Sequence, residues 1–165
     1  MLWDEMGWNG KSTHGERLVF LGRFQHTIDA KGRVSIPVRF REVLKEKYED
    51  ELIVTADIDR CLVAYPTEEW RLFMEKNKQA PMMQQEVKEF LRFSYSRAEP
   101  CSPDKQGRIL ISTLLREYAA LNKQVIVIGL DSKFEFWNVE RWKEKESTIS
   151  QNFTRIGTTL AGLGL

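Results

Sequence analysis

Short runs of alternating apolar and polar residues dominate the chain, and they recur in the same order in its two halves. Alternation with a period of two is typical of strands with one buried face, whereas apolar residues three or four apart indicate a helix. In the first half the strand-like runs are 18–28, 33–36, 51–56 and 61–65, with helical patterns after Pro37 and Pro66. In the second half they are 108–111, 124–129 and 134–137, with helical patterns after Ser112 and Asn138. The pattern predicts two tandem β-β-α-β-β-α units and therefore a β-rich α+β fold.

Three of the predicted helices start with a residue whose side chain can accept a hydrogen bond from a free backbone N–H of the first turn. These residues are Thr67, Ser112 and Asn138. We expect each of them to cap its helix. A further helix, predicted over 81–94, connects the two halves.

The sequence Asp-x-x-Gly-Arg occurs at 29–33 and returns seventy-five positions later, at 104–108. Aspartate at the first position of a tight turn can bond to nearby backbone N–H groups, and glycine at the fourth tolerates dihedrals that other residues avoid. Each copy is followed by an apolar run, so each is expected to form a hairpin turn with its arginine near the tip. The expected turn-shaping residues are Asp29, Gly32, Asp104 and Gly107.

Other positions match at nearly the same offset, which supports an internal repeat. Arg41 aligns with Arg116, and Trp70 aligns with Trp142. Each unit is too small to bury an apolar sheet face by itself, so we expect the two to pack around a pseudo-twofold axis. The predicted organisation is a first repeat at 19–77, a linking helix at 78–96, a second repeat at 97–153 and a flexible tail at 154–165.

Residues 1–18 differ from the rest because they show neither the alternation of a strand nor the three-to-four-residue spacing of a helix. They also lack the basic start and apolar core of a signal peptide. We interpret them as a disordered arm or an over-long translation start, with the native start expected at or near Val19.

The net charge is +1, so the chain as a whole has no strong field that would attract nucleic acid. The distribution is uneven, however. The segment 23–41 has a balance of +4, from Arg23, Lys31, Arg33, Arg39 and Arg41 against Asp29. The segment 97–116 has a balance of +2, from Arg97, Lys105, Arg108 and Arg116 against Glu99 and Asp104. Positive charge thus gathers around both motifs, as an anion-binding face requires, although two solvated hairpins would give the same pattern.

Several classes of function lack a signal in this sequence. No Ser-His-Asp order, metal-ligand spacing or phosphate loop occurs, so we expect neither an enzyme nor a metal or other cofactor. The two cysteines, Cys61 and Cys101, form no pairing pattern and are expected to be buried apolar residues in a reducing cytoplasm. No apolar run approaches the ~20 residues of a membrane-spanning helix.

The segment 24–37, which reads FQHTIDAKGRVSIP and is followed by Phe40-Arg41, resembles the start of the bacterial MraZ family. The second motif, the linking helix and the segment 134–137 agree with that family, so the resemblance covers about 20–153. It implies two tandem swapped-hairpin β-barrel units of the AbrB type with short flanking helices. It also implies a ring-shaped homo-oligomer, commonly an octamer, and a nucleoid-associated transcriptional regulator. Such regulators bind short direct repeats in double-stranded DNA upstream of the division and cell-wall gene cluster, with no membrane partner.

The family's DNA-contacting motif falls on Lys31 and Arg33 in the first copy and on Arg108 in the second. The second copy departs from the first, because Lys105-Gln106 replaces Ala30-Lys31. Arginine can hold two guanine acceptors or two phosphate oxygens at once, and a two-stranded ribbon fits the major groove. The candidate DNA-binding residues are Lys31, Arg33, Arg108, Lys105, Arg23 and Arg41.

Two alternatives remain open from the sequence. Arg33 and Arg108 can pair with nearby carboxylates instead of DNA, because surface ion pairs are common. An antitoxin-like or other protein-binding module with an AbrB-type fold is the alternative function.

Overall fold

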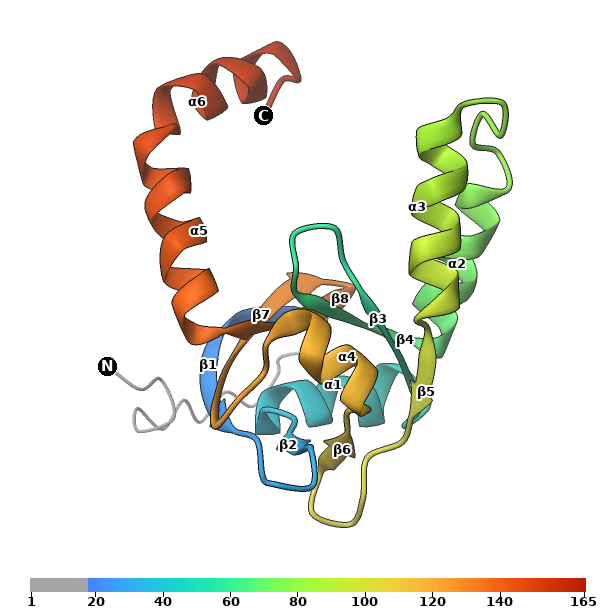
Figure 1. The fold of residues 1–165 in the computed structure, drawn as a ribbon, viewed down its shortest axis with the longest axis vertical. Helices are drawn as coiled ribbons and strands as arrows, with labels where there is room; N and C mark the ends of the chain where they lie inside the picture. The colour runs from blue at the N-terminus through green and yellow to red at the C-terminus, as the bar shows by residue number, and fades with distance from the viewer. Residues whose placement is uncertain (1–17) are drawn as a thin grey trace.

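The computed structural model describes residues 18–165, and the fold is α+β with a mainly antiparallel sheet, as predicted (Figure 1). The expectations for the first seventeen residues lie outside the described part of the chain. The strands are β1 Phe20–Thr27, β2 Arg33–Ser35, β3 Leu52–Ala56, β4 Leu62–Pro66, β5 Glu99–Cys101, β6 Arg108–Leu110, β7 Gln124–Asp131 and β8 Lys133–Asn138. The helices are α1 Val38–Lys47, α2 Thr67–Asn77, α3 Gln85–Ser96, α4 Thr113–Ala119, α5 Val139–Gln151 and α6 Phe153–Gly162.

The strands of the two halves exchange partners instead of forming separate sheets. Six strands make one sheet in the order β1-β7-β8-β4-β3-β5, and β2 pairs with β6 in a second sheet. The sequence repeat makes β1 equivalent to β5, β3 to β7 and β4 to β8, so the order is the same from either edge. Val34 pairs with Ile109 and Val63 pairs with Glu135, and each pair joins equivalent positions of the two halves. A pseudo-twofold axis therefore passes through both pairs.

No closed barrel is present in the described residues, in contrast to the predicted β-barrel units. The six-stranded sheet is open, with β1 and β5 at its edges, and the ribbon of β2 and β6 lies apart from it. The reason is that each half has only short strands with one apolar face. These strands bury that face by pairing with the other half, so neither half closes on itself.

The main core fills the space between the large sheet and a layer made of α1, α4 and the β2–β6 ribbon. Phe20, Phe40 and Phe134 form its centre, with ring centroids 5.1 to 5.2 Å apart and side chains exposed by 1 % or less. Val34 and Ile109 of the ribbon are fully buried in the same core. The ribbon is thus attached to the core by its inner side chains, which fixes the turns that it carries.

Two helical arms extend on opposite sides of the molecule, away from the ribbon (Figure 1). One arm is the α2–α3 pair, where Tyr65 and Trp70 pack with ring centroids 5.5 Å apart. The other is α5–α6, anchored where Trp137 and Trp142 pack at 5.4 Å. The predicted linking helix corresponds to α3.

Two of the three helix caps predicted from the sequence are present in the structure. Ser112 accepts a hydrogen bond from the Leu115 N–H (3.4 Å) and Asn138 accepts one from the Arg141 N–H (2.9 Å), so both caps are confirmed. The Thr67 cap is wrong, because its hydroxyl donates to the Glu51 carbonyl oxygen (3.0 Å). Most of the segment predicted as a flexible tail, 154–165, lies in α6.

Candidate nucleic-acid interface

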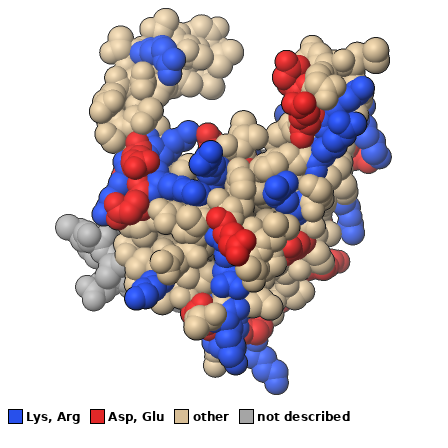
Figure 2. All heavy atoms as spheres, viewed as in Figure 1, with Lys and Arg blue, Asp and Glu red and all other residues tan. Residues whose placement is uncertain are grey.

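Both Asp-x-x-Gly-Arg segments form turns, and the two turns lie side by side at the end of the molecule opposite the helical arms (Figure 1). The first turn leads into β2 and the second into β6, and these strands pair with each other. Their proximity follows from this pairing, because Arg33 faces Leu110 and Ser35 faces Arg108 across the ribbon. Figure 2 shows lysine and arginine side chains gathered at this end.

The first turn is held by the side chain of Asp29. Its Oδ1 accepts hydrogen bonds from the N–H groups of Lys31 (3.0 Å) and Arg33 (2.9 Å), and its Oδ2 accepts one from Arg33 Nε (2.7 Å). The Gly32 N–H donates to the Asp29 carbonyl oxygen (3.0 Å). Gly32 has a φ of +88°, which an L side chain adopts only with strain. One carboxylate therefore fixes both the turn and the arginine at its end.

The second turn repeats this geometry. Asp104 Oδ1 accepts from the N–H groups of Gln106 (2.9 Å) and Arg108 (3.0 Å), and Oδ2 accepts from Arg108 Nε (3.0 Å). Gly107 has a φ of +74°. Asp29 and Asp104 each accept a hydrogen bond from the backbone N–H of the arginine four residues later. This bond is the main cause that lowers the pKa of each carboxyl group below its usual range. Both carboxyl groups are thus held in the ionised form.

Arg33 and Arg108 form ion pairs with Asp29 and Asp104, as expected from the alternative in which these arginines pair with nearby carboxylates. Each pair uses Nε and leaves the terminal nitrogens Nη1 and Nη2 out of the bond. The two arginine side chains are 34 % and 28 % exposed. An ion pair of this kind contributes little stability in water, but it holds the guanidinium in one orientation. Local pairing and contact with a DNA groove are therefore compatible in these residues.

The two turns also support each other across the repeats. The Ile36 N–H donates to the Gly107 carbonyl oxygen, and the Ile111 N–H donates to the Gly32 carbonyl oxygen, both at 2.9 Å. A helix arginine of the opposite repeat covers each glycine. A Cβ on Gly32 would lie 2.6 Å from Arg116 Nε, and a Cβ on Gly107 would collide with the side chain of Arg41. Moving one turn therefore disturbs the other.

The sequence matches the protein family described as "MraZ protein, putative antitoxin-like". The match occurs twice along the chain, over residues 19–93 and 95–162. The chain belongs to the MraZ family. Among its relatives, the transcriptional regulator MraZ of Desulfitobacterium hafniense (strain Y51) is 40 % identical over 147 residues, which are 89 % of this chain and all of that protein. The protein of the same name from Carboxydothermus hydrogenoformans is 45 % identical over 75 % of this chain and 84 % of its own length. The one from Lactiplantibacillus plantarum is 37 % identical over 86 % of this chain and 98 % of its own.

These matches confirm the resemblance, and they confirm the internal repeat because the same family description matches two successive segments of this chain. The first matched copy extends to residue 93 and includes most of α3.

Within this MraZ fold, the structure brings most of the candidate residues together but separates one. Lys31 and Lys105 are exposed in the two turns, next to Arg33 and Arg108, and Arg41 lies against the second turn. Arg23 lies elsewhere, because it precedes Asp29 by six residues, about 20 Å along an extended strand. Its Nη1 forms an exposed ion pair with Glu146 of α5 (3.4 Å). Arg23 is therefore not part of the surface formed by the turns.

Sequence reasoning missed the role of Arg116. Its Nε donates to the Ile111 carbonyl oxygen (3.0 Å) and its Nη2 donates to Thr113 Oγ1 (3.1 Å), while its guanidinium covers Gly32. The alignment of Arg41 with Arg116 was the available signal. It showed that the two positions are equivalent, but it did not show that each arginine contacts the turn of the other repeat.

The two cysteines are free and buried. Burial raises the pKa of the Cys101 thiol to about 11 and raises the pKa of the Cys61 thiol further. Both thiols therefore stay protonated and unreactive near neutral pH.

Proposed function

We propose that this chain is a sequence-specific DNA-binding transcriptional regulator. In this proposal it binds short direct repeats upstream of the division and cell-wall gene cluster, acting in the cytoplasm at the nucleoid. The observation that carries the proposal is the placement of two Asp-x-x-Gly-Arg turns side by side on one paired ribbon. The relatives at 37 to 45 % identity carry the name transcriptional regulator, which supports the same function.

The chemistry of the turns suits this role. A two-stranded ribbon is narrow enough for the major groove, and the arginine at each of its ends can donate two hydrogen bonds to guanine O6 and N7. The carboxylates of Asp29 and Asp104 fix the arginines before DNA arrives, so less side-chain freedom is lost on binding. In this proposal Arg33 and Arg108 contact base edges, and Lys31 and Lys105 contact phosphates.

The exchange of strands between the repeats supports a swapped-hairpin arrangement of the AbrB type as the basis of this surface. β1 of the first repeat pairs along its whole length with β7 of the second, from Phe20–Asp131 to Thr27–Gln124. The symmetry places the turns of both repeats on one face. In this proposal one chain presents two hairpin turns of similar geometry to DNA.

We further propose that copies of the chain assemble into a ring, as an octamer, which presents several ribbons at a fixed spacing. A series of direct repeats would then be bound with avidity even if each ribbon binds weakly. The exposed apolar residues of α6 support assembly, since Phe153 is 62 % exposed and α6 buries no residue in the single chain. A helix with such a surface needs a partner to be stable in water.

None of the helices in residues 18–165 is long and apolar enough to cross a membrane.

The family description contains the term antitoxin-like, which keeps a protein-binding module as the alternative function.

The experiment is an anisotropy titration of DNA from upstream of the chain's own gene, with Arg33→Ala compared with wild type. Losing a two-bond arginine contact is worth about 1–3 kcal/mol per site, so we expect binding to intact repeats to weaken by at least ~5-fold. Arg71→Ala on α2, an exposed arginine far from the turns, is the matched control and should bind like wild type. Binding by Arg33→Ala that equals the control would contradict the proposal and favour a protein partner.

A further inference from the structure

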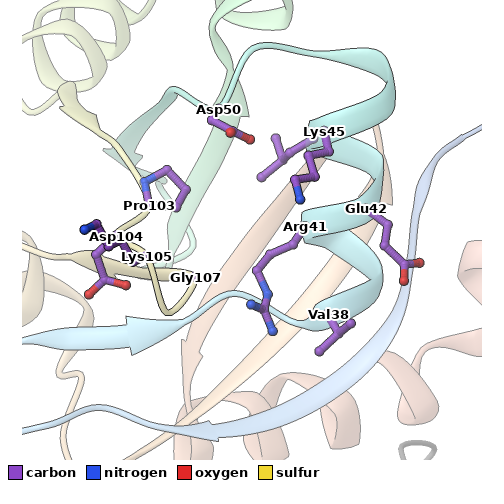
Figure 3. Close-up of a pocket in the computed structure, with 10 residues that line it drawn as sticks. Val38, Arg41, Glu42, Lys45, Asp50, Pro103, Asp104, Lys105 and Gly107 are labelled. Atoms are coloured by element: carbon purple, nitrogen blue, oxygen red, sulfur yellow. The ribbon is translucent and has the colours of Figure 1, made fainter.

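A cleft of about 310 Å³ lies between α1 and the second turn (Figure 3). Its basic lining residues are Arg41, Lys45 and Lys105. Arg41 and Lys45 come from the first repeat and Lys105 comes from the second, so the cleft exists only where the two repeats meet. Figure 3 shows Arg41 extending from α1 toward the loop that carries Gly107.

Arg41 has a hydrogen-bond donor that the described part of the protein leaves unused. Its Nε is buried and has no hydrogen-bond partner among these residues. A buried donor without a partner costs about 1–3 kcal/mol, so such a group is expected to find an acceptor in water or in a ligand. The guanidinium of Arg41 is therefore not fully bonded by the described residues and has donor capacity left for a ligand.

The equivalent arginine of the second repeat is bonded differently. Arg116 covers the first turn and donates to the Ile111 carbonyl oxygen and to Thr113 Oγ1, so protein atoms already engage its guanidinium. The position equivalent to Thr113 is Val38, which has no hydroxyl. Val38 therefore offers no acceptor like the one that Thr113 offers to Arg116 Nη2. The Nε of Arg41 also lacks a carbonyl partner like the one that Arg116 Nε has in Ile111.

Two of the basic residues of the cleft have no basic counterpart in the other repeat. Lys45 and Lys105 occupy the positions equivalent to Ala120 and Ala30. Of the three carboxylates that line the cleft, Asp104 is bound by Arg108 (3.0 Å) and Glu42 points away from Arg41, which leaves Asp50 to oppose the cations (Figure 3). The charge facing the cleft is therefore positive.

We propose that this cleft binds a phosphate group, held by Arg41, Lys45 and Lys105. A guanidinium and two ammonium groups are the donors that proteins commonly use for phosphate oxygens. This inference rests on the proposed function, and the DNA backbone beside the ribbon supplies the phosphate. The two turns then differ in role, because Lys45 and Lys105 stand beside the second turn and alanines occupy the equivalent positions beside the first.

The test compares Lys45→Ala with Lys47→Ala in the full chain. Lys45 lines the cleft, whereas Lys47 lies on the same helix, outside the cleft, with its Nζ 5.0 Å from the Tyr48 ring centroid. Loss of one phosphate contact should weaken binding to intact and scrambled repeats by the same factor. It should also reduce the slope of log K against log [salt] by about 1. Lys47→Ala should leave both quantities unchanged.

A second arm uses inorganic phosphate without DNA, at constant ionic strength, and follows the amide signals of Gly107 and Arg41 by NMR. Shifts that disappear in Lys45→Ala would show that the cleft also takes a free phosphate ion. Absent shifts together with the altered salt slope would identify the DNA backbone as the ligand. Either result supports the cleft.

A Lys45→Ala protein whose salt slope equals that of wild type and of Lys47→Ala would overturn the proposal, even if Arg33→Ala loses binding to the repeats. If Arg33→Ala keeps its binding while Lys45→Ala lowers the salt slope, the cleft stands and the proposed base contact fails. The two proposals can therefore fail separately.

Discussion

Replacing Gly32 with alanine should destabilise the protein, because two features of the structure oppose a side chain there. The first is the backbone, since a φ of +88° costs an L residue roughly 1–2 kcal/mol. The second is space, because a Cβ would lie 2.6 Å from Arg116 Nε and 2.8 Å from the Ile111 carbonyl oxygen. The arginine can move, but the carbonyl belongs to the backbone, and overpacking of this kind costs about 1–3 kcal/mol. Together they predict a loss of about 2–5 kcal/mol in the free energy of unfolding.

Urea unfolding followed by circular dichroism measures this loss as a shift of the midpoint at constant slope. Gly157→Ala is the matched control, because Gly157 lies within α6 and a Cβ there meets nothing within 4 Å. Its predicted change is zero or a slight gain of up to ~1 kcal/mol, since alanine favours helix. A Gly32→Ala loss below ~0.5 kcal/mol would refute the close packing of Arg116 on the first turn.

Two further predictions concern the sheet and the α5–α6 arm. Burial raises the pKa of Glu135, more than the hydrogen bond from Trp137 Nε1 (2.7 Å) lowers it. The unfolded chain then ionises first as pH rises, so Glu135→Gln should stabilise the protein at pH 7 and have no effect well below the unfolded pKa, near pH 3. Equal midpoint shifts in urea at both pH values would be evidence against this burial effect. Ending the chain at Asn152 removes α6 and should reduce the assembly to smaller species in light scattering, with the circular dichroism of the sheet unchanged. An unchanged mass would rule out α6 as an assembly contact.

How far the sequence predicted the structure depends on the range of each interaction. Helix caps at Ser112 and Asn138 were predictable because the cap and its partner are neighbours in sequence. The Thr67 prediction failed because a distant acceptor, the Glu51 carbonyl oxygen, takes its hydroxyl. α6 was missed because its glycines and threonines disfavour helix in local reasoning.

The candidate DNA-binding site was also predictable only where its signals are local in the sequence. The two turns could be located because the spacing of aspartate and glycine is a local signal. Their position side by side, and the contacts of Arg41 and Arg116 with the opposite turns, depend on strand exchange between the repeats. Periodicity predicts that a strand exists but does not specify its partner, so neither the open sheet nor the cleft beside Gly107 could be predicted.

The most direct test of the account is the affinity of the wild-type chain for DNA from upstream of its own gene, with the direct repeats intact or scrambled. An anisotropy titration over a range of salt concentrations measures it. The account predicts tight binding to intact repeats that weakens steeply with salt, and binding to scrambled repeats that is at least ~10³-fold weaker. Equal and weak binding to both probes would contradict the claim that the two turns read a DNA sequence.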